Sequence, residues 1–364
     1  MDRPKDRLVI HASNAIGGGS GAVVRSLAAA IGAVKHPALD VETWIPDTPV
    51  FRQWAESALG LTFVYKAIER RGKWARLRET VLRPPRFAEH DKVLVLGDLP
   101  LAGVGHQTVF IHLAHLVAPQ VDGYVSRSLS YRIQRWVLAR NLKYTSKVIV
   151  QTSAMGDSLR RSYPRFEGAI NVISSPSPIA GVRAVESLGR GRLFRFLFPA
   201  GALPHKNHAV LWATARCCLA DSVPAEFLVT LDEAEAAKFD PRPANVVICG
   251  KLTAEKMVEA YAAADGLFFP SVLESYGLPL VEAMGAGLAI VAADRPYARC
   301  LCGDRAHYFS PYDSGAATKA IRDAIEAHHA GEKPQWGDRL GLIEPDWPSA
   351  ARKFLAVVFE ANGR

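Results

Sequence analysis

The chain has 364 residues, 49% of them hydrophobic and 22% charged, and a formal net charge of +8. This composition excludes a disordered or fibrous protein, and the length favours two domains over a single core. The moderate positive charge indicates attraction to anions without distinguishing nucleic acid, lipid or nucleotide.

The sequence shows neither a targeting signal nor a metal-binding spacing. No apolar run reaches the roughly 18 to 20 residues that span a bilayer, and the N-terminal residues lead directly into an apolar strand, unlike a signal peptide. The five cysteines have no zinc-binding spacing, and their odd number favours reduced thiols. We therefore expect a cytoplasmic protein, or one peripheral on the inner face of the cytoplasmic membrane.

The first half of the chain alternates strand and helix patterns. A strand at 7–11 leads into the glycine-rich segment Asn14–Gly21 and then into an apolar helix from Ala22 to Val34, the opening of a doubly wound α/β domain. The glycine-rich segment matches neither the dinucleotide fingerprint nor a P-loop, so a ligand-binding loop and a plain connection remain equal alternatives. Further elements are predicted at 41–45, 93–96, 108–111, 147–150 and 171–173 as strands and at 153–163 as a helix.

Two basic segments in this half carry aromatic and apolar residues among their cations. The first runs from Glu69 to Phe87, and the second comprises Arg127, Arg132, Arg135, Trp136, Arg140 and Lys143. Such a pattern fits an anionic membrane surface and fits an exposed, solvated helix equally well. Nucleic acid is the other partner of such a patch, but no recognised nucleic-acid-binding module accompanies it.

The predicted strand 108–111 ends in His112, and His115 follows three residues later. Open α/β sheets bind ligands at the carboxyl ends of their strands. A neutral imidazole there could hydrogen-bond a ligand or deprotonate a hydroxyl group. The alternative is a histidine that only satisfies its own hydrogen bonds within the fold.

The segment 174–191 is rich in Pro, Ser and Gly and is predicted to link two domains. A second series of strands and helices follows it, and such alternation requires a parallel sheet in each half. In this second half, strands are predicted at 195–198, 225–230, 245–249, 266–269 and 289–291, and helices at 208–220, 253–264, 280–284 and 347–359.

A glycine turn and a lysine follow the first strand of this second series. Gly201 lies in the turn, and Lys206 stands just before the helix that begins at His208. A lysine there can pair with a diphosphate as a compact charge, adding to the field of the helix N-terminus. The alternative is a solvated lysine at a helix end.

The stretch from Phe268 to Gly287 carries the most specific pattern of the chain. An apolar strand leads into a loop with Glu274, and a Gly-Leu-Pro step ending at Pro279 opens a helix that carries Glu282. Proline suits the first helical turn, and the free amides before it form a natural phosphate site. The carboxylates could hold hydroxyl groups on either side of that phosphate, which describes a nucleotide sugar. Two solvated glutamates are the alternative for such a pair taken alone.

The segments that begin at Phe196 and Phe268 closely resemble the donor half of the retaining glycosyltransferases of family 4. The resemblance implies a GT-B fold, in which two Rossmann-like, doubly wound α/β domains with parallel sheets face a central cleft. The expected organisation is an N-terminal acceptor domain at 1–175, a linker at 176–191, a donor domain at 192–346 and a C-terminal helix at 347–364 that crosses back to the N-terminal domain.

The resemblance also implies the roles of single residues. His112 would point at the reacting sugar, Glu274 would hold its hydroxyl groups, and Lys206 would bind the diphosphate, so that these three are the expected catalytic residues. Glu282 would hold the ribose. The expected donor-binding residues are Gly18, Gly19, Gly201, Lys206, Ser275, Tyr276, Gly277, Leu278 and Glu282. The chain has no Asp-x-Asp pair, and we expect no metal and no other cofactor.

Two positions depart from the family pattern. Many members carry an arginine where this chain has Ala202. Either the lysine then works with another cation, such as Arg25, Arg295 or Arg299, or donor affinity is lower. Relatives also commonly carry a glutamate near the position of Cys300.

The predicted function is transfer of a hexose or deoxyhexose, with a mannose-type sugar slightly preferred, from GDP or UDP to a hydroxyl group of a glycan. The acceptor is expected to be lipid-linked, as in the assembly of O-antigen or capsule, with an anionic membrane surface and no nucleic acid as further partners. The alternatives are a nucleotide-sugar epimerase or a phosphorylase on the same fold, or a non-catalytic homologue that binds nucleotide sugars.

Overall fold

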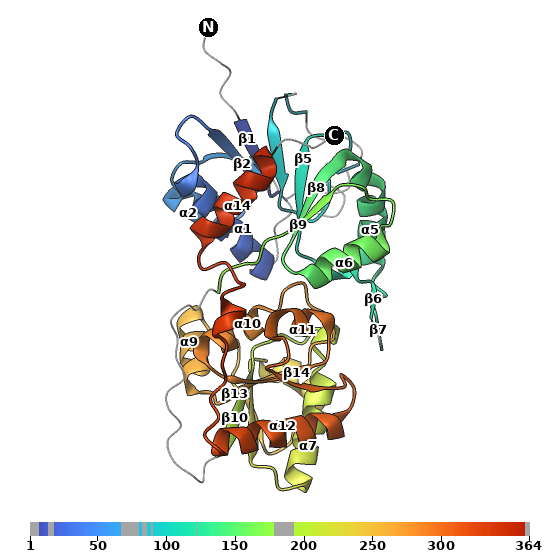
Figure 1. Cartoon of the computed structure of the whole chain (residues 1–364), viewed down its shortest axis with the longest axis vertical. Coiled ribbons are helices and arrows are strands. Elements are labelled where there is room, and N and C mark those ends of the chain that lie inside the picture. The colour runs from blue at the N-terminus through green and yellow to red at the C-terminus, as the bar shows by residue number, and fades with distance from the viewer. Residues whose placement is uncertain are drawn as a thin grey trace. The chain divides into compact units, whose positions relative to one another are not determined.

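The computed structural model of the protein describes residues 7–13, 18–66, 80–81, 86–88, 90–121, 123–177 and 193–360 (Figure 1). Contacts divide the chain into two compact units. Unit 1 comprises residues 1–119, 126–176 and 344–364, and unit 2 comprises residues 120–125 and 177–343. The C-terminal segment therefore belongs to the first unit.

Unit 1 is built around a parallel sheet. Within the described residues its seven strands follow the order β3-β2-β1-β4-β5-β8-β9, and all neighbouring pairs are parallel. Successive strands are added in opposite directions from β1 and from β4, so the topological switch point lies between these two strands. The strands are β1 Arg7–His11, β2 Asp40–Pro46, β3 Thr62–Lys66, β4 Lys92–Val95, β5 Gln107–Ile111, β8 Thr145–Val150 and β9 Ala169–Val172.

Helices cover both faces of this sheet because its strands are apolar on both sides. Alternate residues of a strand point to opposite faces, so Leu94 joins the core under α1, α2 and α14, whereas Val93 and Val95 join the core under α4, α5 and α6. The helices of unit 1 are α1 Gly18–Val34, α2 Pro49–Ser57, α4 Ala114–Val117, α5 Leu129–Asn141, η2 Leu142–Tyr144, α6 Ser153–Ser162 and α14 Trp347–Phe359.

The C-terminal helix α14 is fastened to unit 1 by apolar and polar contacts. Figure 1 shows it beside α1, far from it in sequence. The ring of Phe354 meets the ring of Phe110 edge-on at 5.2 Å between centroids. The ammonium group of Lys147 donates a 2.7 Å hydrogen bond to the carbonyl of Val357. This helix therefore completes the core of the unit.

Unit 2 has a second parallel sheet with the Rossmann order of strands. Within the described residues that order is β12-β11-β10-β13-β14-β15, and the switch point lies between β10 and β13. The strands are β10 Phe194–Phe198, β11 Ala225–Val229, β12 Val246–Ile248, β13 Gly266–Phe269, β14 Ala289–Ala293 and β15 His307–Phe309, and β6 Gln120–Val121 pairs antiparallel with β7 Tyr124–Val125.

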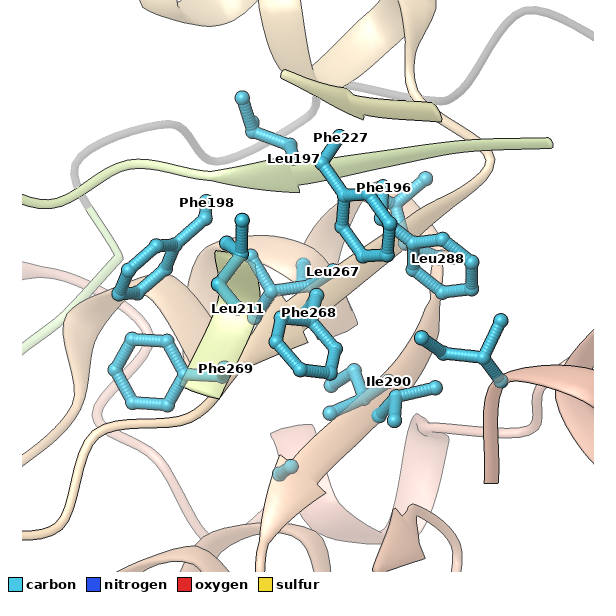
Figure 2. Close-up of a cluster of buried hydrophobic side chains, with 14 of the residues drawn as sticks. Phe196, Leu197, Phe198, Leu211, Phe227, Leu267, Phe268, Phe269, Leu288 and Ile290 are labelled. Atoms are coloured by element: carbon cyan, nitrogen blue, oxygen red, sulfur yellow. The ribbon is translucent and has the colours of Figure 1, made fainter. Parts of the chain in front are cut away.

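The core of unit 2 is rich in phenylalanine from adjacent strands (Figure 2). Phe268 of β13 stacks on Phe309 of β15 at 5.3 Å and meets Phe227 of β11 edge-on at 5.5 Å. Such rings bury large apolar areas and fix the positions of the strands from which the loops emerge. The helices are α7 His208–Ala220, α8 Glu233–Ala236, α9 Ala254–Ala263, α10 Leu278–Ala286, α11 Pro296–Cys302, α12 Ser314–His329 and α13 Gly337–Leu340, with 3-10 turns η3 Pro204–Lys206 and η4 Ala237–Phe239.

The two parallel Rossmann-like sheets confirm the predicted fold class, but some elements differ. Helix α1 begins at Gly18, four residues before the predicted start, because the glycine-rich segment supplies its first turn. The strand β15 has only three residues and gives too short a pattern to be predicted. The strand β3 and the helix α12 were also not predicted, and a helix over the residues of α5 was one of two alternatives. Most of the predicted linker, residues 178–191, lies outside the described residues.

Removal of the Phe354 ring tests how far α14 stabilises unit 1. Phe354→Ala empties a buried site between α14 and β5, so we expect the free energy of unfolding of this unit to fall by about 3–5 kcal/mol. Urea denaturation followed by circular dichroism measures the change. Arg352→Ala, at an exposed position of the same helix, is the matched control. A loss equal to that of the control would show that α14 contributes little.

Candidate functional site

Two loops of unit 2 meet at the switch point of its sheet. The loop after β10 carries the turn η3, and the loop after β13 leads to α10. The amide of Val272 donates to the carbonyl of His205 at 2.8 Å. Asn207, in the left-handed conformation with φ 58°, donates from its side chain to the carbonyls of Pro270 at 3.3 Å and Pro311 at 2.6 Å. These hydrogen bonds fix the positions of the two loops relative to each other.

An ion pair joins these loops. The Lys206 ammonium donates to Glu274 Oε1 at 2.6 Å, and the two side chains are 17% and 12% exposed. The cation also lies 5.9 Å from the ring centroid of Phe269. In such a partly buried place each charge needs the other, because an unpaired charge carries a desolvation penalty of several kcal/mol. Sequence analysis assigned both residues to one ligand, and the structure brings them into direct contact.

Helix α10 begins beside this ion pair. Its N-cap is Gly277, whose φ of 92° favours glycine. Leu278 and Pro279 then open the helix. Pro279 has no N–H, and the amide of Leu280 donates to the carbonyl of Gly277 at 2.9 Å, so a ligand here would use the backbone amides before Pro279 and the positive end of the helix dipole. Tyr276 is buried in the core, and only its backbone can serve a ligand. Ser275 is half-buried in the same loop.

The second carboxylate, Glu282, is held by a tyrosine. The hydroxyl group of Tyr261 in α9 donates to Glu282 Oε2 at 2.6 Å, and the glutamate is 9% exposed. Burial raises the pKa of Glu282, and the hydrogen bond from Tyr261 partly opposes this shift. Sequence analysis did not find Tyr261, because a tyrosine within a helical pattern gives no signal of a polar partner.

Other cations of unit 2 surround the loops to different extents. Arg299 pairs with Asp294 at 2.8 Å and Asp304 at 2.9 Å, so its charge is already engaged. Arg295 is buried at the start of α11, with its guanidinium group 5.9 Å from the ring centroid of Tyr312. Arg295 is therefore a buried cation at the carboxyl edge of the sheet, where β14 ends.

Tyr297 of α11 is bonded to the loop that follows β13. Its hydroxyl group donates to the carbonyl of Ser271 at 2.6 Å. Its pKa is raised well above the usual value, first by burial and then by the charge of Glu274, whereas the charge of Arg295 lowers it. Its hydroxyl group therefore ties α11 to the loop that carries Glu274.

The glycine and alanine of the first loop differ in their surroundings. A side chain at Gly201 would meet no atom within 4 Å, so a ligand could approach the backbone there. Ala202, where many family 4 members carry arginine, packs against the core of unit 2. His208 is also a core residue, and burial lowers its pKa to about 4.

In unit 1 the predicted histidine is anchored by an aspartate. Asp98 lies in the loop after β4 with a φ of 66°. Its Oδ1 accepts hydrogen bonds from the amides of His112 at 2.7 Å and Leu113 at 3.0 Å. Its Oδ2 lies 3.5 Å from Nε2 of the imidazole. Asp98 was missed by sequence analysis, because the contact depends on the neighbouring positions of β4 and β5.

The remaining predicted groups of unit 1 have other surroundings. His115 is buried and stacks on Tyr131 with 4.4 Å between ring centroids, so it is the weaker candidate. Gly18 and Gly19 form the start of α1, and residues 14–17 lie outside the described residues. The basic segment from Glu69 to Phe87 also lies mostly outside them. Arg25 faces the ring of Phe51 at 5.4 Å.

Neither a metal site nor a spanning helix is found in the described part of the chain. No group of three or more His, Cys, Asp or Glu residues there could hold a metal ion. No helix there is long and apolar enough to cross a bilayer. The five cysteines are free thiols.

Removing the Tyr261 hydroxyl group should destabilise unit 2 in a pH-dependent manner. Because burial raises the folded-state pKa of Glu282, stability is lost as pH rises from the unfolded value of about 4.3 through the folded value. Tyr261→Phe raises that pKa further. We expect a loss of about 1 kcal/mol at pH 4.5 and about 1.5–3 kcal/mol at pH 8, measured by urea denaturation.

Tyr297→Phe is the matched control for this measurement. It deletes an equally buried hydroxyl group whose acceptor is a carbonyl, so its cost should vary little with pH. Equal pH dependence of both variants would contradict the assigned link between Tyr261 and the ionisation of Glu282.

The role of Asp98 can be tested by two substitutions at one position. Asp98→Ala leaves the amides of His112 and Leu113 without their acceptor, and we expect unit 1 to lose about 2–4 kcal/mol of stability. Asp98→Asn keeps an acceptor oxygen and tolerates the left-handed backbone, so it should lose at most about 1 kcal/mol in the same urea titration. Equal losses would show that the carboxamide oxygen cannot replace the carboxylate.

The match to a protein family by sequence lies in unit 2, whereas solved structures of similar fold match nearly the whole chain. Residues 195–327 match the family model described as Glycosyl transferases group 1. The serotype-specific mannosyltransferase WbdA of Escherichia coli is 33% identical over 87 residues, which are 22% of this chain and 11% of that protein. The chain therefore spans a small part of this relative.

Solved structures of similar fold cover nearly all of the chain. Sucrose-phosphate synthase from Thermosynechococcus elongatus has a TM-score of 0.68 at 15% identity, covering 97% of this chain and 98% of that one. WaaG, a glycosyltransferase involved in lipopolysaccharide biosynthesis, has a TM-score of 0.63 at 17% identity, covering 98% and 100%. The chain thus has the GT-B fold of two Rossmann-like domains, and its residues 195–327 match the model of glycosyl transferases group 1.

Proposed function

We propose that the protein is a retaining glycosyltransferase of family 4 that transfers a hexose or deoxyhexose from a nucleoside diphosphate to a hydroxyl group of a glycan. The observation that carries the proposal is the Lys206–Glu274 ion pair at the switch point of the unit 2 sheet. Open α/β sheets bind nucleotides at this point. The match of this region to glycosyl transferases group 1 supports the same conclusion.

The donor is proposed to bind by exchanging partners with the ion pair. The diphosphate takes Lys206 as its cation, together with amides at the start of α10. Glu274 is released from the lysine and accepts hydrogen bonds from the transferred sugar, while Glu282 holds the ribose. Arg295 is the further cation that we assign in place of the arginine missing at Ala202, because it lies buried at the same edge of the sheet.

The chemistry follows from where charge develops. The bond between the anomeric carbon and the diphosphate oxygen breaks with its electron pair on the oxygen. The acceptor oxygen bonds to the same face of that carbon, and its proton passes to the departing diphosphate oxygen. Negative charge grows on the leaving phosphate, where a positioned cation and helix amides stabilise it. We propose that His112 hydrogen-bonds the sugar or the acceptor hydroxyl. We propose no metal in this reaction.

The substrate assignments rest on the named relatives. WbdA is a mannosyltransferase and WaaG acts in lipopolysaccharide biosynthesis, so we propose a mannose-type donor on GDP, with UDP as the other base to be tested. We propose a lipid-linked glycan acceptor and a place at the inner face of the cytoplasmic membrane.

Substitutions of the ion pair should separate nucleotide binding from sugar transfer. Lys206→Ala removes the cation, and we expect it to weaken binding of GDP or UDP by about 10- to 100-fold in calorimetry. Glu274→Ala should keep the dissociation constant of the bare nucleotide within about threefold of that of the unsubstituted protein. The same variant should release nucleoside diphosphate in the presence of acceptor at least about 100-fold more slowly.

Lys251→Ala is the matched control, because Lys251 pairs with Asp232 at 2.9 Å on an exposed part of the same unit. Lys251→Ala should change neither the affinity for the nucleotide nor the rate of nucleoside diphosphate release. Nucleotide binding and turnover that survive both Lys206→Ala and Glu274→Ala would refute the donor site. Turnover without acceptor, or only with inorganic phosphate, would favour an epimerase or a phosphorylase instead.

A further inference from the structure

Helix α5 of unit 1 presents an apolar row to solvent. Leu129, Ile133 and Trp136 are 66%, 47% and 56% exposed. Their spacing of four and three residues places them on one side of the helix, and Arg140 continues the row one turn further on. We call these four residues the α5 face. The inward side of α5 carries the buried residues Val137, Leu138 and Asn141, so the exposed row is not part of the core.

The inward contacts of α5 fix this orientation. The side-chain amide of Asn141 donates to the carbonyls of Thr80 at 2.9 Å and Pro100 at 2.8 Å. Val137 and Leu138 belong to the apolar core of unit 1. A helix held by such bonds cannot rotate its exposed row inward without breaking them. The α5 face is therefore a stable surface of the unit.

Cations surround the α5 face without any acidic residue in the same stretch. Residues 127–143 contain five Arg and Lys residues and neither Asp nor Glu. Arg132, Arg140 and Lys143 are exposed, and the guanidinium group of Arg140 lies 5.7 Å from the ring centroid of Trp136. The face thus combines large apolar side chains with a strong local positive charge.

The chemistry of the α5 face fits a bilayer interface. Leucine and isoleucine gain free energy when they leave water for the acyl boundary, and tryptophan prefers the interface itself. The flanking arginine and lysine side chains can reach anionic headgroups while their apolar stems stay buried. We propose that the α5 face docks unit 1 on the surface of an anionic lipid bilayer, with the helix lying in the plane of the interface.

Two other occupants fit the face less well. A second copy of the chain would place two clusters of cations against each other, which opposes association. Nucleic acid would satisfy the charges and could stack on Trp136, but it would leave the exposed Leu129 and Ile133 in water. The docking surface deepens the membrane location proposed above. It does not depend on the transfer reaction, since α5 carries none of the residues assigned to the donor, and it is tested without any nucleotide sugar.

The experiment is co-sedimentation of the full chain with vesicles. Vesicles made of equal parts phosphatidylglycerol and phosphatidylcholine should pellet the protein, and vesicles of phosphatidylcholine alone should bind it far more weakly. Leu129→Ser/Ile133→Ser/Trp136→Ser should reduce the partition coefficient at least about 30-fold. Arg132→Gln/Arg140→Gln should reduce it about 30-fold at low salt, at roughly fivefold for each cation.

Arg160→Gln/Arg161→Gln is the matched control, since it removes two exposed cations from α6 of the same unit. The partition coefficient of this control should be at least about a third of that of the unsubstituted protein. Equal losses in the α5 and α6 charge variants, or no preference for anionic vesicles, would overturn the proposal. So would α5-dependent binding to single-stranded RNA without vesicle binding, or a dimer in light scattering that the triple serine variant dissociates. Circular dichroism of each variant confirms that unit 1 stays folded.

Discussion

The ion pair between Lys206 and Glu274 is the interaction on which the site in unit 2 depends. It joins the loops that follow two adjacent parallel strands at the point where the order of the sheet reverses. Its atoms are largely shielded from water, so neither charge is stable there alone. Loss of either partner would leave a partly buried, unpaired charge, and a ligand that brings both an anion and hydroxyl groups can satisfy the two partners separately.

The surroundings of the pair keep these loops in place. Asn207 binds backbone carbonyls of two other loops, and Tyr297 binds the carbonyl of Ser271. The phenylalanine-rich core beneath them fixes the strands. A site whose parts are held by buried hydrogen bonds needs little rearrangement when charge develops, which is the condition for electrostatic stabilisation of a transition state. The Tyr261–Glu282 bond extends this principle to the second carboxylate.

Much of the fold could be predicted from the sequence, because parallel strands buried on both faces leave continuous apolar runs. β1 and β10, for example, agree with their predicted ranges to within one residue. The pattern around Glu274 and Glu282 likewise marked the loop and helix that hold them. Short elements were missed because the three residues of β15 form no period.

Contacts between distant segments could not be predicted. Asp98 and His112 are 14 residues apart in the sequence and meet only because β4 pairs with β5. Tyr261 reaches Glu282 from another helix. Sequence analysis identified the cations of α5 but did not show that Leu129, Ile133 and Trp136 are exposed. Apolar residues at helical spacing usually belong to the core, and their exposure becomes known only when the neighbouring elements are known.

The most direct test of the central claim is a crystal structure of the protein with a nucleoside diphosphate sugar, GDP-mannose first and a UDP-sugar second. We predict that the diphosphate lies at the start of α10, with Lys206 Nζ moved from Glu274 to a phosphate oxygen and Glu274 bonded to sugar hydroxyls. A nucleotide bound elsewhere on the chain, with the 2.6 Å contact between Lys206 and Glu274 intact, would contradict the account.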